Sequence, residues 1–253
     1  MTAPILYCGD TNLDGAASYL AGLMTHFGWA FDYVPSHVPM TRELIEQPHS
    51  LLILSDYPAS QFDDDLQRIA LKQVERRMGL LMIGGWESFH GFGGDWNETP
   101  LGDALPVEIG RRDDRVNFSQ SAMLARNYGA DVHAVLKGLP WDEHPPAIGG
   151  LNRVVGKAMS ETALYAVPHK VYVQNQEFVF DARQPRPALV FGKQSRGRTA
   201  AFMSDVAPHW VGGFVDWGPD RVKAQAAGAS AIEVGSHYAQ FWKQLLSWVG
   251  RLE

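Results

Sequence analysis

The sequence predicts an α/β protein in which helices cover both faces of a mostly parallel sheet. The first observation is a set of four apolar runs of strand length, at Pro4–Gly9, Trp29–Val34, Ser50–Ser55 and Gly79–Ile83. The second is that segments with helical or capping patterns lie between these runs. The third is that a polar residue or a glycine follows each of the strands that we expect to be central. Regular alternation of strand and helix is typical of parallel sheets that are buried on both faces.

The first predicted helix follows the first strand and begins near Asp10-Thr11-Asn12. Thr11 and Asp14 resemble a capping box, and Gly28 is a plausible stop. Apolar residues recur at helical spacing between these limits, at Leu13, Ala16, Ala17, Leu20, Met24 and Phe27.

Two further helices are expected before the fourth strand. Residues Thr41–Glu46 predict a short one. Ser60 and Asp63 form a second capping-box pattern, which predicts a longer helix that Gly79 terminates. Its buried face would contain Phe62, Leu66, Ile69, Ala70 and Val74.

The pattern weakens after Leu101 and becomes regular again near residue 188. Pro106–Ile109 predicts a short strand, and we expect an irregular insertion or a small antiparallel extension at about residues 106–187. Residues 188–191 and 198–203 predict a hairpin. A final helix has one apolar face, formed by Tyr238, Phe241, Trp242, Leu245, Leu246, Val249 and Leu252. Since we find no repeat or long linker, residues 1–253 are interpreted as a single domain.

Composition bounds the function. The net charge of −6 and pI of about 5.8 argue against a nucleic-acid partner, because a phosphate backbone needs a basic surface. No apolar run approaches the ~18 residues of a membrane span, so no membrane partner is expected. The N-terminal residues lack a signal-peptide pattern, and the single Cys8 cannot form an intrachain disulfide. These features predict a cytoplasmic protein with a small-molecule ligand. We also expect a homo-oligomer, because symmetric homo-oligomers are common.

Polar side chains follow several predicted strands. Asp10 follows the first strand and Asp56 the third. The fourth is followed by Gly85, Trp86, Glu87, Ser88 and His90, and the late strand by Asp205, His209 and Trp210. Because ligands bind at the carboxyl ends of parallel strands, we expect a site there that is suited to acid–base chemistry or to polyhydroxylated ligands.

Each candidate also has a structural interpretation. Asp10 and Asp56 could cap the helices that follow them, and Glu87 could pair with an arginine or cap backbone amides. His209 could pack in a structural corner. Cys8 fits an inert core thiol. The aromatic residues near the site could stack on ligand rings or fill the core, namely Trp86, Phe89, Phe92, Trp96, Trp210, Phe214 and Trp217.

Cofactor patterns are weak. The sequence has no H-x-H, H-x-x-x-H or C-x-x-C spacing, and Gly91–Gly94 lacks the G-K-[ST] ending of a phosphate loop. We therefore predict no metal and no cofactor.

Four segments resemble a known family. Residues 83–94 with 99–107, residues 197–210 and residues 238–248 resemble the glutamine amidotransferase-like proteins of bacteria, which are related to class I glutamine amidotransferases and to trehalose-utilisation-type proteins. The resemblance spans nearly the whole chain and implies a flavodoxin-like fold.

The resemblance also implies where a catalytic cysteine would stand. Class I amidotransferases have a G-x-C-x-G turn after the fourth strand, and the equivalent turn here is Ile83-Gly-Gly-Trp-Glu87. A glycine therefore occupies the nucleophile position, and the thioester route needs a thiolate.

These observations leave three hypotheses. The first is a small-molecule enzyme, acting on a sugar or another polar metabolite, with Glu87, His209 and Asp205 as catalytic residues. Its substrate-binding residues would be Asp10, Asp56, Gly85, Trp86, Ser88, His90 and Trp210. The second is a non-catalytic binding or scaffold module, that is, a pseudoenzyme. The third is an amidotransferase or amidase with a displaced nucleophile, for which Ser88 and Cys8 are the candidates.

Overall fold

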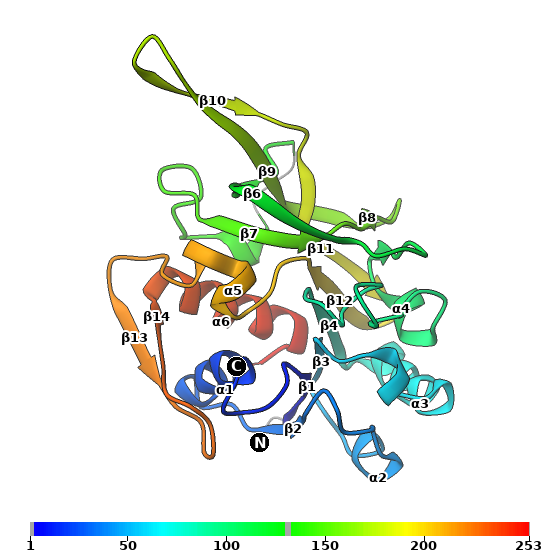
Figure 1. Cartoon of the computed structure of the whole chain (residues 1–253). Coiled ribbons are helices and arrows are strands. Elements are labelled where there is room, and N and C mark those ends of the chain that lie inside the picture. The colour runs from blue at the N-terminus through cyan, green and yellow to red at the C-terminus, as the bar shows by residue number, and fades with distance from the viewer. Residues whose placement is uncertain (1–2, 130–132, 253) are drawn as a thin grey trace.

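A computed structural model describes residues 3–129 and 133–252 of the chain. Its centre is one continuous sheet (Figure 1). The parallel half has the order β2-β1-β3-β4-β12. These strands are β1 (Ile5–Gly9), β2 (Phe31–Val34), β3 (Leu51–Ser55), β4 (Gly79–Ile83) and β12 (Gly197–Phe202). This arrangement confirms the predicted flavodoxin-like α/β fold.

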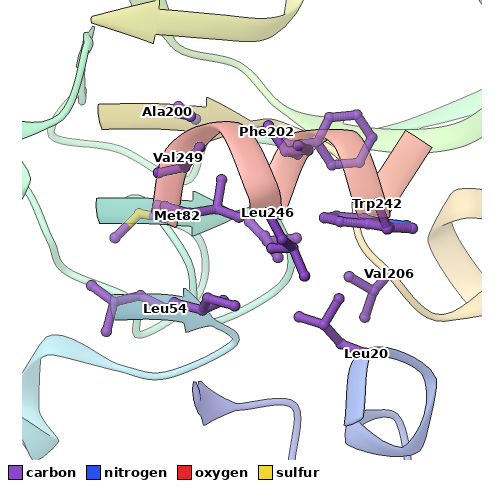
Figure 2. Close-up of a cluster of buried hydrophobic side chains, with 14 of the residues drawn as sticks. Leu20, Leu54, Met82, Ala200, Phe202, Val206, Trp242, Leu246 and Val249 are labelled. Carbon is purple, nitrogen blue, oxygen red and sulfur yellow. The ribbon is translucent and has the colours of Figure 1, made fainter. Parts of the chain in front are cut away.

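Helices lie on both faces of the parallel half, so β1, β3 and β4 are buried along their whole length. Helices α1 (Ala17–His26) and α6 (Ser236–Gly250) pack together on one face, and α2 (Arg42–Ile45) and α3 (Asp64–Arg76) lie on the other (Figure 1). The predicted face of α6 provides much of the core. Figure 2 shows Trp242, Leu246 and Val249 against strand residues that include Leu54, Met82 and Phe202.

The beginnings of two helices differ from the prediction. Helix α1 starts at Ala17, and no side chain caps it, because Asp10 and Thr11 have φ values of 52° and 65° and cannot enter a right-handed helix. The capping box at Thr11 and Asp14 is therefore wrong. Helix α3 has Asp63 as its N-cap, whose side chain accepts from the amide of Leu66 at 2.9 Å. Ser60 lies in the preceding 3₁₀ turn η1 (Ala59–Gln61).

The segment expected to be irregular or antiparallel is an antiparallel continuation of the same sheet. The strands follow the order β12-β11-β9-β6-β7, and β10 pairs with β9. Their bounds are β6 (Arg115–Arg126), β7 (Ala147–Asn152), β9 (Glu161–Gln174), β10 (Glu177–Ala182) and β11 (Arg186–Gln194). The antiparallel alternative is confirmed, and the register of β6 against β7 includes a shift that interrupts clean alternation in the sequence.

Short elements complete the described structure. They are α4 (Pro100–Ala104), α5 (Pro208–Val211), β5 (Val107–Glu108), β8 (Val155–Gly156), β13 (Arg221–Ala224), β14 (Ile232–Gly235), η2 (Ala134–Leu136) and η3 (Gly212–Phe214). Within residues 3–129 and 133–252, no helix has the length and apolar character that crossing a membrane requires.

Candidate functional site

Two aspartates stand at the point where the strand order reverses. Asp10 follows β1 and Asp56 follows β3, and these two strands are neighbours in the sheet. From β1 the chain continues to β2 on one side, and from β3 it continues to β4 on the other side. Ligands of open α/β sheets bind at such switch points. Both aspartates are in the left-handed region, with φ values of 52° and 45°. Non-glycine residues in this conformation are uncommon and cluster at functional sites.

Asp10 is almost fully buried, with 1% of its surface exposed. The hydroxyl of Ser55 donates to its Oδ1 at 3.0 Å, and the hydroxyl of Tyr7 donates to its Oδ2. Burial raises the pKa of Asp10 well above its usual value, and the neighbouring charges of Asp205 and Asp56 raise that pKa further. Asp10 is thus a buried carboxyl group with a raised pKa, and both of its oxygens accept hydrogen bonds from neighbouring side chains.

Asp56 is held by the loop that follows β4. Its Oδ1 accepts from the amide of Glu87 at 2.7 Å, and its own amide donates to the hydroxyl oxygen of Ser88 at 2.9 Å. Burial and the charge of Asp205 raise the pKa of Asp56 to about 7. Burial also raises the pKa of Glu87. Asp56 therefore exchanges its proton near neutral pH.

A buried carboxylate orients an exposed imidazole. Asp205 follows β12, and His209 lies on α5, with Nε2 of His209 2.9 Å from Oδ2 of Asp205. The side chain of Asp205 is 1% exposed, whereas that of His209 is 55% exposed. The close contact with the Asp205 carboxylate raises the pKa of His209. The imidazole is paired with that carboxylate through one nitrogen and is open to solvent over much of its surface.

These five residues, Asp10, Asp56, Glu87, Asp205 and His209, form what we call the strand-end site. The charge of Asp205 raises the pKa of both Asp10 and Asp56, and the charge of His209 lowers the pKa of Asp56. The structure therefore brings together at one edge of the sheet all three residues predicted to be catalytic and two of those predicted to bind substrate.

Three other predicted substrate-binding residues have contacts that support the fold. The hydroxyl oxygen of Ser88, which is 1% exposed, accepts from Asp56. His90 places its Nδ1 2.8 Å from Oδ1 of Asn97. The buried ring of Trp210 donates from Nε1 to Asn117 at 2.5 Å. Their role toward a ligand stays a prediction.

Gly85 and Asn152 connect the two halves of the sheet. The amide of Gly85 donates to Oδ1 of Asn152 at 2.8 Å, and Nδ2 of Asn152 donates to the Gly85 carbonyl at 3.0 Å and to Oδ1 of Asp114 at 2.7 Å. Asn152 and Asp114 are buried. Neither residue was among the predicted site residues, because both lie in the segment without clear periodicity. A buried Asn that satisfies a backbone amide and carbonyl fixes the loop after β4.

Arg115 is a further residue near the site that the sequence did not predict. Its guanidinium carbon lies 4.3 Å from the ring centroid of Trp86 and 4.9 Å from that of Phe92. It forms an ion pair with Asp113 at 2.7 Å, and the negative charge of Asp56 also raises the pKa of Arg115. Trp86 and Phe92 are 50% and 69% exposed, so this cation and two exposed rings border the strand-end site. The other aromatic candidates are core residues, namely Phe89, Trp96, Phe214 and Trp217.

Neither alternative nucleophile is placed to react. Cys8 is fully buried in β1, and burial raises the pKa of its thiol, so the thiolate is disfavoured. The hydroxyl of Ser88 is buried against the backbone of Asp56. Across the described parts of the chain, no group of three or more His, Cys, Asp or Glu side chains has an arrangement that could hold a metal ion.

We predict that Asp56→Asn stabilises the protein at neutral and alkaline pH. The folded-state pKa of about 7 lies above the unfolded value, so wild type loses stability as the pH rises from about 4 to about 7. An asparagine side chain does not titrate in this range, and its amide oxygen can still accept a hydrogen bond from the backbone amide of Glu87. The variant should therefore gain stability relative to wild type as the pH rises. The difference between their free energies of unfolding should be about 2 kcal/mol larger at pH 8 than at pH 5. Urea denaturation at both pH values measures this. An equal difference at both would contradict the raised pKa.

The fold and this edge of the sheet define a class of protein: a flavodoxin-like α/β protein with carboxylates and an imidazole at the strand ends and glycine at the turn after β4. Within that class, the chain belongs to the family described as "putative glutamine amidotransferase", whose model matches residues 16–251. No curated protein matches the chain.

Solved structures show the same fold. Two cytoplasmic proteins of Salmonella typhimurium, one of them from strain LT2, each have a TM-score of 0.72. They are 22% and 23% identical and cover 97% of this chain, and the matches span 98% and 99% of their own chains. A ThuA-like protein of Parabacteroides merdae has a TM-score of 0.59 at 13% identity, over 99% of this chain and 90% of its own.

Proposed function

We propose that this protein is an acid–base enzyme that acts on a small polar molecule, such as a sugar or a sugar-derived metabolite, without a cysteine nucleophile. The observation that supports it most strongly is the Asp205–His209 pair beside Asp56. A buried carboxylate that orients an accessible imidazole is the arrangement by which enzymes fix the orientation of a general base.

The two groups would have complementary roles at neutral pH. His209 in its neutral form accepts a proton from a substrate O–H or C–H group. Asp56, whose pKa is raised to about 7, is partly protonated there and can return a proton to the product. Glu87 would accept hydrogen bonds from substrate hydroxyl groups, and the exposed face of Trp86 would contact the apolar face of a sugar ring. Asp10, which is buried and already accepts from Ser55 and Tyr7, would support the site without touching the substrate.

The alternatives make different predictions. A binding or scaffold module would bind the same ligands without turning them over. An amidotransferase or amidase with a displaced nucleophile has less support, because Cys8 and the Ser88 hydroxyl are buried. We propose a cytoplasmic location for this protein. The two similar Salmonella proteins are both named as cytoplasmic proteins, which supports this location.

A ligand screen followed by a turnover assay tests the proposal. Purified protein is screened by thermal shift against sugars, sugar acids, nucleosides and amino acids, because a ligand of the folded state raises Tm. Each ligand found is then incubated with the protein and analysed by mass spectrometry. Conversion of a ligand supports the enzyme; binding without conversion at high protein concentration supports the binding module. Ammonia release from glutamine would support the third hypothesis.

A further inference from the structure

The antiparallel half of the sheet has one face that faces the core and one that the described chain leaves uncovered. On the core side of β9, Leu164 and Ala166 are buried. The residues between and beyond them alternate to the other face, where Tyr165, Val167, His169 and Val171 are only partly buried. In an antiparallel sheet with one solvated face, that face is normally polar. Here most of these side chains are apolar, and His169 is the exception.

The apolar face continues onto the β9–β10 hairpin, which extends away from the rest of the protein (Figure 1). The register pairs Val173 with Phe178 and Val171 with Phe180, so these four side chains share the face. Val173, Phe178 and Phe180 are 62%, 72% and 64% exposed. The opposite face of the hairpin contains the Lys170–Asp181 pair and Tyr172. The hairpin is therefore two-sided, with one apolar face and one mixed face.

The neighbouring strand extends this surface. Met123 on β6 pairs with Val167 and, on its other side, with Ala147 on β7, and all three are partly buried. We call the apolar surface formed by Met123, Val167, Val171, Val173, Phe178 and Phe180 the outer sheet face. Monomeric proteins rarely expose an apolar surface of this extent, and a two-stranded hairpin is only marginally stable without cover.

We propose that the outer sheet face is the contact surface of a homodimer, in which the faces of two copies pack against each other about a two-fold axis. The size fits this occupant. Phe178, Phe180 and Val173 are more than 60% exposed, and an aromatic side chain has roughly 150–250 Å² of surface, so the six side chains together expose on the order of 500 Å². Two copies together then bury on the order of 1,000 Å², which is the lower limit for a specific interface.

The chemistry of the face also fits a second copy. Its six side chains are apolar, and His169, which shares their face between Val167 and Val171, adds a single imidazole. The same surface repeated across a two-fold axis therefore brings mainly apolar side chains together. Flat apolar sheet faces pack on each other at about 10 Å, as in β-sandwiches. The strand-end site lies on the parallel half of the sheet, so this surface is separate from it.

Sedimentation velocity of the full chain tests the proposal. Wild type at tens of micromolar is expected at twice the chain mass of 28.0 kDa. The double variant Phe178→Glu/Phe180→Glu places two charges within the contact and should weaken the dimer by at least about 100-fold, giving the monomer mass. Because both side chains are exposed on the hairpin, circular dichroism should show an intact fold.

Tyr172→Glu is the matched control. Tyr172 is 40% exposed on the other face of the same hairpin, so this variant should remain a dimer. A wild-type protein that stays monomeric at 100 µM or above overturns the proposal. A dimer that persists in the double variant overturns it as well, because another surface would then hold the copies together. Equal dissociation of the control and the double variant would show that the outer face has no special role, and would also overturn it.

Discussion

Replacing His209 by asparagine is expected to lower kcat by about 10²- to 10⁴-fold on a substrate of the strand-end site, the usual contribution of a general acid or base. The imidazole is the exposed member of the pair with Asp205, and asparagine keeps a side chain of similar size without a group that titrates. Ligand affinity, measured by thermal shift, should change much less than kcat. A variant with full activity would remove His209 from the mechanism.

Asp205→Asn separates the role of orientation from that of proton transfer. The carboxylate of Asp205 raises the pKa of His209, so its replacement should lower that pKa toward the ordinary value. If neutral His209 is the base, the acidic limb of kcat/KM then moves to lower pH while the maximum falls. The His209 titration is also visible by NMR without any substrate. His26→Asn is the matched control, because His26 is exposed at the far end of α1 and should change neither quantity.

The second large effect is expected when a sulfur is placed at the turn after β4. A Cβ at Gly85 would lie 2.1 Å from Oδ1 of Asp56 and 2.4 Å from its Cγ, closer than any non-bonded contact allows. Gly85→Cys should therefore lower the free energy of unfolding by about 3 kcal/mol, the upper range for overpacking a filled site. It should also release no ammonia from glutamine. Chemical denaturation and a glutaminase assay measure the two outcomes.

A double-mutant cycle identifies the cause of that loss. If the carboxylate of Asp56 occupies the space, Gly85→Cys should cost less in an Asp56→Gly background, and the loss that remains there reports the backbone strain at Gly85, whose φ is 157°. Gly110→Cys is the control, since a Cβ at Gly110 has no atom within 4 Å and should change stability by no more than about 0.5 kcal/mol. Equal losses at Gly85 in both backgrounds would show that Asp56 does not exclude the side chain.

The parallel half of the fold could be predicted from the sequence because its information is local. Each buried strand is a continuous apolar run, and α6 presents a full apolar face, so periodicity is sufficient. The start of α1 could not be found in this way. Asp10 and Thr11 have a capping composition, but contacts of Asp10 with Tyr7 and Ser55 hold that segment outside the helix.

The candidate site was predictable to the extent that it follows from strand order. Asp10, Asp56 and Asp205 follow strands, and the parallel arrangement of those strands places them together. Asn152 and Arg115 could not be predicted in the same way, because they reach the site from β6 and β7, whose register includes a shift that no local pattern reveals.

The burial of Cys8 determines how the folded protein responds to thiol chemistry. Peroxide and alkylating reagents attack an accessible thiolate, and here the single sulfhydryl lies inside β1 with a raised pKa. The turn after β4, where amidotransferases hold their reactive sulfur, contains only glycine at that position. Iodoacetamide should leave the native chain unlabelled and label it only on unfolding, so oxidative conditions that inactivate thiol-dependent enzymes would leave this site intact.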